Sequence, residues 1–121
     1  MKRPDPRIYL THILESIELI ESYVAGIEIS AFVQDQEKQD AVVRRIEIMG
    51  EAVKNLPGDL REANPQVPWA RITGMRDKVV HDYMGVDSEL VWTVATTQLE
   101  ELRNDVQAIL YGLQNQSGGT V

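Results

Sequence analysis

The stretch DAVVRRIEIMGEAVKNLP (residues 40–57) decides the fold class. Its apolar side chains recur at alternating steps of four and three residues, which is the spacing of one face of an α-helix. These side chains are Val42, Ile46, Met49, Val53 and Leu56. Because one face is apolar, the helix must bury that face against other helices. The pattern predicts a helix from about Val33 to Leu56, ended by Pro57-Gly58.

Apolar residues recur with the same helical spacing in residues 5–26, before this stretch. Asp5-Pro6 predicts a helix start, with a capping carboxylate followed by proline at the first helical position, and Gly26 marks the end. The apolar stripe between them consists of Leu10, Ile13, Leu14, Ile17, Ile20 and Val24.

Two further helices are predicted towards the C-terminus. Residues 59–68 indicate a short helical turn and a loop, followed by a helix from Pro68 to a glycine cap at Gly85. A last helix opens at Asp87, with apolar positions at Leu90, Val91, Val94, Leu99, Leu102, Val106, Ile109 and Leu113. No alternating strand pattern occurs. We therefore expect an all-α, antiparallel four-to-five-helix bundle.

Length and composition limit the possible functions. The 121 residues predict one helical domain over 1–114 and a flexible tail over 115–121. The chain has no cysteine and two histidines, so we expect no metal site. No apolar run approaches the length of a membrane span, which favours a cytoplasmic protein without a membrane partner. The net charge of −7 opposes a broadly basic nucleic-acid surface, so any RNA contact must be a local cationic site.

The decapeptide RDKVVHDYMG (76–85) carries the candidate chemistry. On a helical wheel, Arg76 lies within roughly 60° of the apolar stripe formed by Trp69, Ile72, Val79, Val80 and Tyr83. A guanidinium in apolar surroundings requires an anion or other acceptors, because an unpaired charge is costly to desolvate. Arg76 therefore binds either a carboxylate of the protein or an anionic ligand.

His81 lies roughly 140° from Arg76 on the same wheel. Asp77 is four residues before His81 and shares its face, so its carboxylate is placed to orient the imidazole. Arg76 and His81 can meet if the helix distorts near its end or if two copies of the motif meet across a two-fold axis. We favour the second geometry, a homodimer, because it needs no strain.

A plain structural interpretation stands beside the chemical one. In it, Arg76 pairs with a carboxylate at the edge of the core and His81 is a cation at the helix end. Glu51 is a plausible partner for a basic group. His12 lies off its apolar stripe and is expected to be solvated.

The chain resembles the HEPN superfamily, specifically the HepT-like toxins that are paired with minimal nucleotidyltransferase (MntA-like) antitoxins. The most specific stretch is PWARITGMRDKVVHDYMGVD (68–87), which holds the Arg-x4-His-x-Tyr motif within a PW…GMR…HDY context. The resemblance also covers 9–24, 40–57 and 90–94. One departure is Gln98-Leu99-Glu100, since relatives often have a proline after the leucine.

The resemblance implies a homodimeric, metal-independent and cofactor-free ribonuclease of a type VII-like toxin–antitoxin pair. Arg76 and His81 match the catalytic pair, Asp77 the supporting polar residue, and Tyr83 the tyrosine that the nucleotidyltransferase antitoxin adenylylates. The implied substrate is RNA, either tRNA or mRNA.

Two other functions stay open. The first is a non-catalytic helical module that binds a nucleotidyltransferase, which the isoelectric point of 4.7 favours. The second is a nucleotide-binding domain that uses Arg76 on phosphate, which the lack of a glycine-rich phosphate loop disfavours.

Overall fold

The computed structural model describes residues 4–81 and 87–118, and within these ranges the regular structure is entirely helical. The helices are α1 (Pro6–Val24), α2 (Ile29–Phe32), α3 (Gln36–Asn55), α4 (Gly58–Ala63), α5 (Trp69–His81), α6 (Ser88–Thr97) and α7 (Leu99–Gly118). The predicted all-α class is confirmed. Five longer helices form the bundle, and α2 and α4 are short connecting helices.

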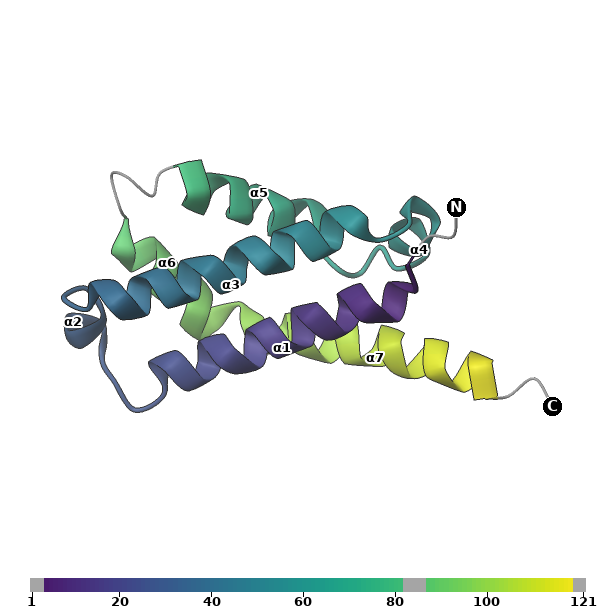
Figure 1. The fold of residues 1–121 in the computed structure, drawn as a ribbon, viewed down its shortest axis with the longest axis horizontal. Helices are drawn as coiled ribbons and strands as arrows, with labels where there is room; N and C mark the ends of the chain where they lie inside the picture. Colours follow the sequence, from purple (N-terminus) through teal and green to yellow (C-terminus); the bar gives the residue numbers. More distant parts are fainter. Residues whose placement is uncertain (1–3, 82–86, 119–121) are drawn as a thin grey trace.

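The bundle is elongated, with neighbouring long helices running antiparallel (Figure 1). Helix α3 packs on α1 along one side and on α5 along the other, while α7 packs on α1. Helix α6 contacts α1, α2 and α3. Helix α5 is therefore an outer helix that packs chiefly on α3. The side chains on the inner face of α5 are positioned by their contacts with α3.

The predicted stripes of α1 and α3 lie in the core, except that Leu14 is only partly buried. The fully buried side chains are Leu10, Ile13, Ile17, Ile20, Phe32, Val42, Ile46, Met49, Val53 and Val106. Burying one such side chain stabilises the fold by about 1.5–3 kcal/mol. The expectation for His12 is also confirmed, because it is exposed.

Aspartates fix the starts of three long helices. The carboxylates of Asp5, Asp35 and Asp87 accept hydrogen bonds from backbone N–H groups in the first turns of α1, α3 and α6, each at 3.0 Å. Each bond satisfies a donor that has no partner inside its helix. The predicted starts at Asp5-Pro6 and Asp87 are confirmed.

Two predicted boundaries are wrong. The helix predicted from Val33 begins at Gln36, and the preceding turn forms α2. The helix predicted to continue from Asp87 to Leu113 breaks at Gln98 into α6 and α7. The threonines of the last two turns of α6 bond through their hydroxyls to carbonyls four residues back, which is known to bend helices.

The remaining boundary predictions fall partly beyond the described residues. Helix α5 begins at Trp69 and is described as far as His81, whereas the predicted cap Gly85 lies outside the described part. Helix α7 continues to Gly118, past the predicted domain end at residue 114, and the flexibility of the tail stays a prediction. Within the described ranges, no helix has the length and hydropathy needed to cross a membrane.

Candidate functional site

Helix α5 places Arg76 on the side that faces α3. Trp69 fixes the start of this helix, because its indole N–H donates to the carbonyl oxygens of Arg61 and Asn64 at 3.1 and 3.0 Å. Ile72 and Val79 are buried, and Arg76 lies between them at the spacing of the same face. Its side chain is 24% exposed. The predicted position of Arg76 on the core-facing stripe is confirmed.

Gly50 of α3 provides the space for the stem of Arg76. A Cβ added at Gly50 would lie 2.5 Å from both Cβ and Cγ of Arg76, closer than real atoms approach. Glycine within a helix costs about 1 kcal/mol relative to alanine. The close approach of α5 offsets that cost and fixes the lateral position of Arg76.

Two carboxylates hold the guanidinium head. Arg76 Nη2 lies 3.0 Å from Glu51 Oε1 on α3, and Arg76 Nη1 donates to Asp77 Oδ1 at 3.0 Å. Arg76 Nε is buried and has no hydrogen-bond partner among the described residues. Glu51 was expected to pair with a basic group, and this expectation is confirmed.

The Asp77 carboxylate is shared between two cations. Besides Arg76, the same oxygen accepts a bond from Lys54 Nζ of α3 at 3.5 Å. The hydrogen bond from Arg76, followed by the charge of Lys54, lowers the pKa of Asp77 below its ordinary value. In return, the bond to Asp77 raises the pKa of Arg76; partial burial opposes this rise, and the charges of Glu51 and Glu47 support it.

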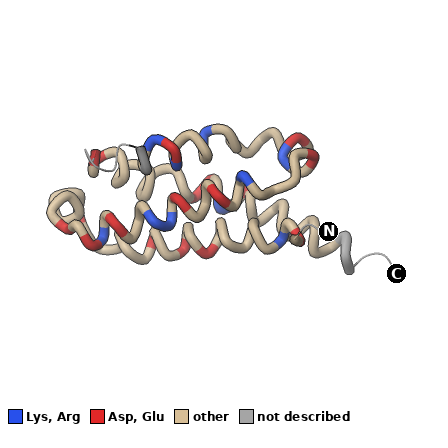
Figure 2. Tube along the Cα trace, turned by 45° about the horizontal axis from the view of Figure 1, so that its top comes forward, with Lys and Arg blue, Asp and Glu red and all other residues tan. Residues whose placement is uncertain are grey.

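We call the residues Glu47, Glu51, Lys54, Arg76 and Asp77 the Arg76 cluster. Two cations face three carboxylates in it, so the cluster is not a basic patch. Figure 2 shows the wider pattern, in which basic and acidic positions intermix along the helices. Glu47, in addition, lies 3.9 Å from Arg44 one turn earlier on α3.

The second half of the motif is described only in part. Helix α5 is described as far as His81, and the side chain of His81 lies outside the described part of the structure. Residues 82–86 lie outside it as well, and Tyr83 is among them. The hydrogen bond expected between His81 and Asp77, the site at Tyr83 and the shared dimer cleft therefore stay predictions.

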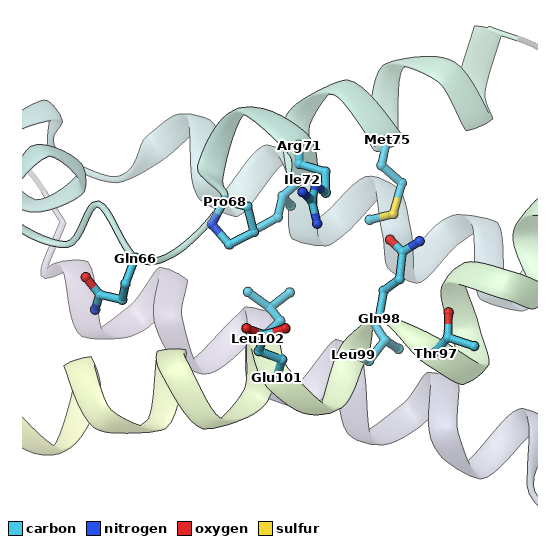
Figure 3. A pocket seen from close by; sticks show the side chains of 10 residues that line it. All are labelled: Gln66, Pro68, Arg71, Ile72, Met75, Thr97, Gln98, Leu99, Glu101 and Leu102. Carbon is cyan, nitrogen blue, oxygen red and sulfur yellow. The ribbon is translucent and has the colours of Figure 1, made fainter.

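A separate cavity of about 370 Å³ lies between the starts of α5 and α7. In Figure 3, Arg71 and Met75 extend from α5 on one wall of the cavity, and Gln98 and Leu102 lie on the opposite wall. Arg71 is exposed, as expected for a solvated charge. The cavity does not include Arg76 or Asp77, so it is distinct from the Arg76 cluster. Among the described residues, no three acidic or histidine side chains gather in the manner of a metal site.

The Ribonuclease HepT-like family model matches residues 13–109, which include the Arg76 cluster and His81. The chain belongs to this family. This confirms the resemblance drawn from the motif and its context.

Several relatives align with this HepT-like chain over most of their length. A protein of Caldanaerobacter subterraneus, provisionally named an RNase, is 46% identical over 87% of this chain and 94% of its own. "Probable ribonuclease HepT" of Thermococcus cleftensis is 39% identical over 84% of this chain and 92% of its own. A provisionally named RNase of Methanocaldococcus jannaschii is 31% identical over the full length of both. No solved structure matches the chain significantly.

Sequence reasoning identified part of the site of this HepT-like chain. It singled out Arg76, Asp77 and Glu51, but it did not identify Gly50 or Lys54 as their neighbours. Gly50 and Lys54 are four residues apart, and Lys54 follows Glu51 by three, so they flank one strip of α3. That spacing indicates that the three residues share one strip of the surface of α3. It does not indicate which residues of α5 pack against that strip.

Proposed function

We propose that this chain is a metal-independent endoribonuclease, the toxin of a two-component system whose partner is an MntA-like minimal nucleotidyltransferase. The observation that carries the proposal is the family match over residues 13–109, which includes an Arg-x4-His-x-Tyr motif whose arginine is held at a partly exposed site. The ribonuclease names of the relatives support the same chemistry.

The proposed reaction uses the 2′-hydroxyl of RNA as its nucleophile. A base removes the hydroxyl proton while the 2′-oxygen bonds to the adjacent phosphorus. The bond from phosphorus to the 5′-oxygen then breaks, and an acid donates a proton to that leaving oxygen. The products are a 2′,3′-cyclic phosphate and a 5′-hydroxyl. Imidazole carries out such proton transfers near neutral pH and typically contributes 10²–10⁴-fold, so His81 is the proposed base and acid.

Arg76 is proposed to bind the non-bridging phosphate oxygens. Its planar fork of donors matches a phosphoryl group and stabilises the charge of the phosphorane. Support comes from the stem of Arg76, which Gly50 and the close α3–α5 packing hold in one place. A catalytic cation needs such positioning before the substrate arrives.

The dimer supplies the second imidazole of the proposed mechanism. Two copies of α5 that meet across a two-fold axis would place two arginines and two histidines in one cleft, so that one His81 acts as base and the other as acid. Two adjacent arginines would also concentrate positive charge locally in a chain whose net charge is −7.

Tyr83 is the proposed point of control by the partner. Adenylylation of its phenol would attach a bulky phosphodiester two residues after His81. The added negative charge would compete with RNA for Arg76. We therefore propose that the nucleotidyltransferase inactivates the ribonuclease by this modification.

Cleavage of a mixed RNA pool in excess EDTA tests the activity. We expect fragments with 2′,3′-cyclic phosphate ends, and no cleavage of DNA of the same sequence because it lacks the nucleophile. Activity that requires added Mg²⁺ or Mn²⁺ would contradict the proposed chemistry. Arg76→Ala and His81→Ala should each abolish cleavage, and Arg76→Lys serves as the matched control. Lysine keeps the charge but lacks the fork, so this variant should stay severely impaired.

Mixing two inactive variants tests the shared cleft. Arg76→Ala and His81→Ala chains, refolded together, should form mixed dimers in which one cleft keeps an intact arginine and an intact histidine. We expect only partial recovery of cleavage, because the single intact imidazole can serve one of the two proton transfers. A chain that is monomeric by light scattering at micromolar concentration would rule out this arrangement.

One observation favours a second function. Because Glu51 and Asp77 already neutralise Arg76, the cluster also suits a non-catalytic helical module that binds the nucleotidyltransferase. In that case neither the native chain nor Arg76→Ala would cleave RNA, and the substitution would alter only partner binding. Measuring cleavage and partner affinity on the same variant separates the two functions.

A further inference from the structure

The guanidinium of Arg76 already has two carboxylate partners before any substrate arrives. Of its five N–H donors, one on Nη2 faces Glu51, one on Nη1 bonds Asp77, and the Nε donor is buried without an acceptor among the described residues. Glu47 adds a third negative charge close enough to support the raised pKa of Arg76. A phosphate that approaches this head therefore meets carboxylates first.

The stem of Arg76 is packed closely against α3. Its Cβ and Cγ lie against Gly50, where no room remains even for a methyl group. With the stem held there, a phosphate that binds the Nη1 or Nη2 atom must compete with the carboxylate that already contacts that atom. The candidates to leave are Glu51 and Asp77.

Glu51 is the acceptor that can leave. Its side chain and that of Asp77 are similarly exposed, at 54% and 58%, so exposure does not distinguish them. Among the described residues, however, the ion-pair partner of Glu51 is Arg76 alone. The shorter Asp77 follows Arg76 directly in the sequence and is also bonded by Lys54. Releasing Asp77 would break two ion pairs, whereas releasing Glu51 breaks one.

We propose that Glu51 is the resident counter-ion of Arg76 and that RNA phosphate binds at Arg76 by displacing the Glu51 carboxylate. The inference rests on the proposed function and adds a positioning residue to it. In the free protein Glu51 holds the guanidinium head in place; in the complex a phosphate takes its position at Nη2. Asp77 and Lys54 stay in place and keep the other side of the head fixed.

The effect of Glu51 on RNA affinity should be modest. An ion pair between partly exposed side chains is weak, so competition from Glu51 weakens RNA binding by at most about fivefold. Phosphate forms charge-assisted bonds with a guanidinium, of the same kind as those of the carboxylate that it replaces. Displacement is therefore feasible without unfolding any part of α3 or α5.

Glu51→Gln tests the proposal, because the amide keeps the shape of the side chain and removes its charge. Binding is measured by fluorescence anisotropy with a labelled single-stranded RNA of mixed sequence, in the His81→Ala background so that the RNA stays intact. We expect tighter binding by up to about fivefold. The slope of log affinity against log salt should steepen by up to about 0.7, because Glu51 then no longer offsets the charge of Arg76.

Glu47→Gln is the matched control. It removes the same charge one turn earlier on α3. In the described part of the structure, Glu47 acts on Arg76 through its charge and its ion pair is with Arg44. Its effect on affinity should be clearly smaller than that of Glu51→Gln. If the two variants gain RNA affinity equally, only the overall negative charge near Arg76 affects binding. The proposed displacement of Glu51 would then be wrong.

Inorganic phosphate is the second probe and separates this inference from the proposed function. Phosphate binding is followed through the NMR signals of the arginine side chains in the native and Glu51→Gln chains. Tighter phosphate binding by Glu51→Gln supports the counter-ion role even if no RNA is cleaved, in which case the ribonuclease proposal alone fails. Affinity for RNA and phosphate that is unchanged or weaker in Glu51→Gln overturns the inference, whatever the cleavage assay gives.

Discussion

Gly50→Ala is the most direct test of how α3 positions Arg76. The added methyl carbon would lie 2.5 Å from Cβ and Cγ of Arg76, so either α5 or the helix backbone at residue 50 must shift. Overpacking of this kind costs about 1–3 kcal/mol, while alanine gains about 1 kcal/mol over glycine in a helix. We expect the free energy of unfolding to fall by about 1 kcal/mol.

Two other helical glycines provide matched controls. Gly74 of α5 and Gly112 of α7 have no atoms within 4 Å of an added Cβ, so the propensity gain is not opposed there. Gly74→Ala and Gly112→Ala should each stabilise the fold by up to about 1 kcal/mol. The difference between Gly50→Ala and these controls, about 1–3 kcal/mol, isolates the contact with Arg76.

Urea unfolding followed by far-ultraviolet circular dichroism measures these changes. All variants are compared at one protein concentration, because association of chains would make the midpoint depend on concentration. A shift of the midpoint at constant slope reports stability alone. If Gly50→Ala unfolds at the same urea concentration as Gly112→Ala, or higher, the close approach of Arg76 to α3 is wrong.

Three further predictions use the same chain. Asp77→Asn should be less stable than the native protein at pH 7. The pKa of Asp77 is lowered in the folded chain, so its carboxylate stabilises the fold at pH values above 3.8, its ordinary pKa. The free energies of unfolding of the two proteins should therefore converge as the pH falls below 3.8. Glu100→Pro should fold with a free energy of unfolding within about 1 kcal/mol of native in urea titrations, since residue 100 lies in the first turn of α7, where proline is tolerated. Tyr83→Phe should keep its ribonuclease activity and escape inactivation on co-expression with the nucleotidyltransferase. Cell growth reports the inactivation, and the mass of the peptide that contains residue 83 reports the modification. Full inactivation of this variant would point to another mode of inhibition.

The sequence by itself determined which faces of the helices are buried. Apolar positions at steps of three and four residues share one side of any α-helix, so Val42, Ile46 and Met49 could be assigned to the core without coordinates. The helix starts at Asp5 and Asp87 followed from the chemistry of capping. The motif and its context likewise predicted the family to which the chain belongs.

Only the tertiary structure decided what meets across the helices. Periodicity places Arg76 on the inner face of α5, but the distance and register between α5 and α3 place it over Gly50 and beside Glu51. The break at Gln98 also depends on packing, because α6 contacts α2 and α3 in addition to α1. A local pattern sets the direction of a side chain relative to its own helix, whereas the partner it contacts depends on how two helices pack.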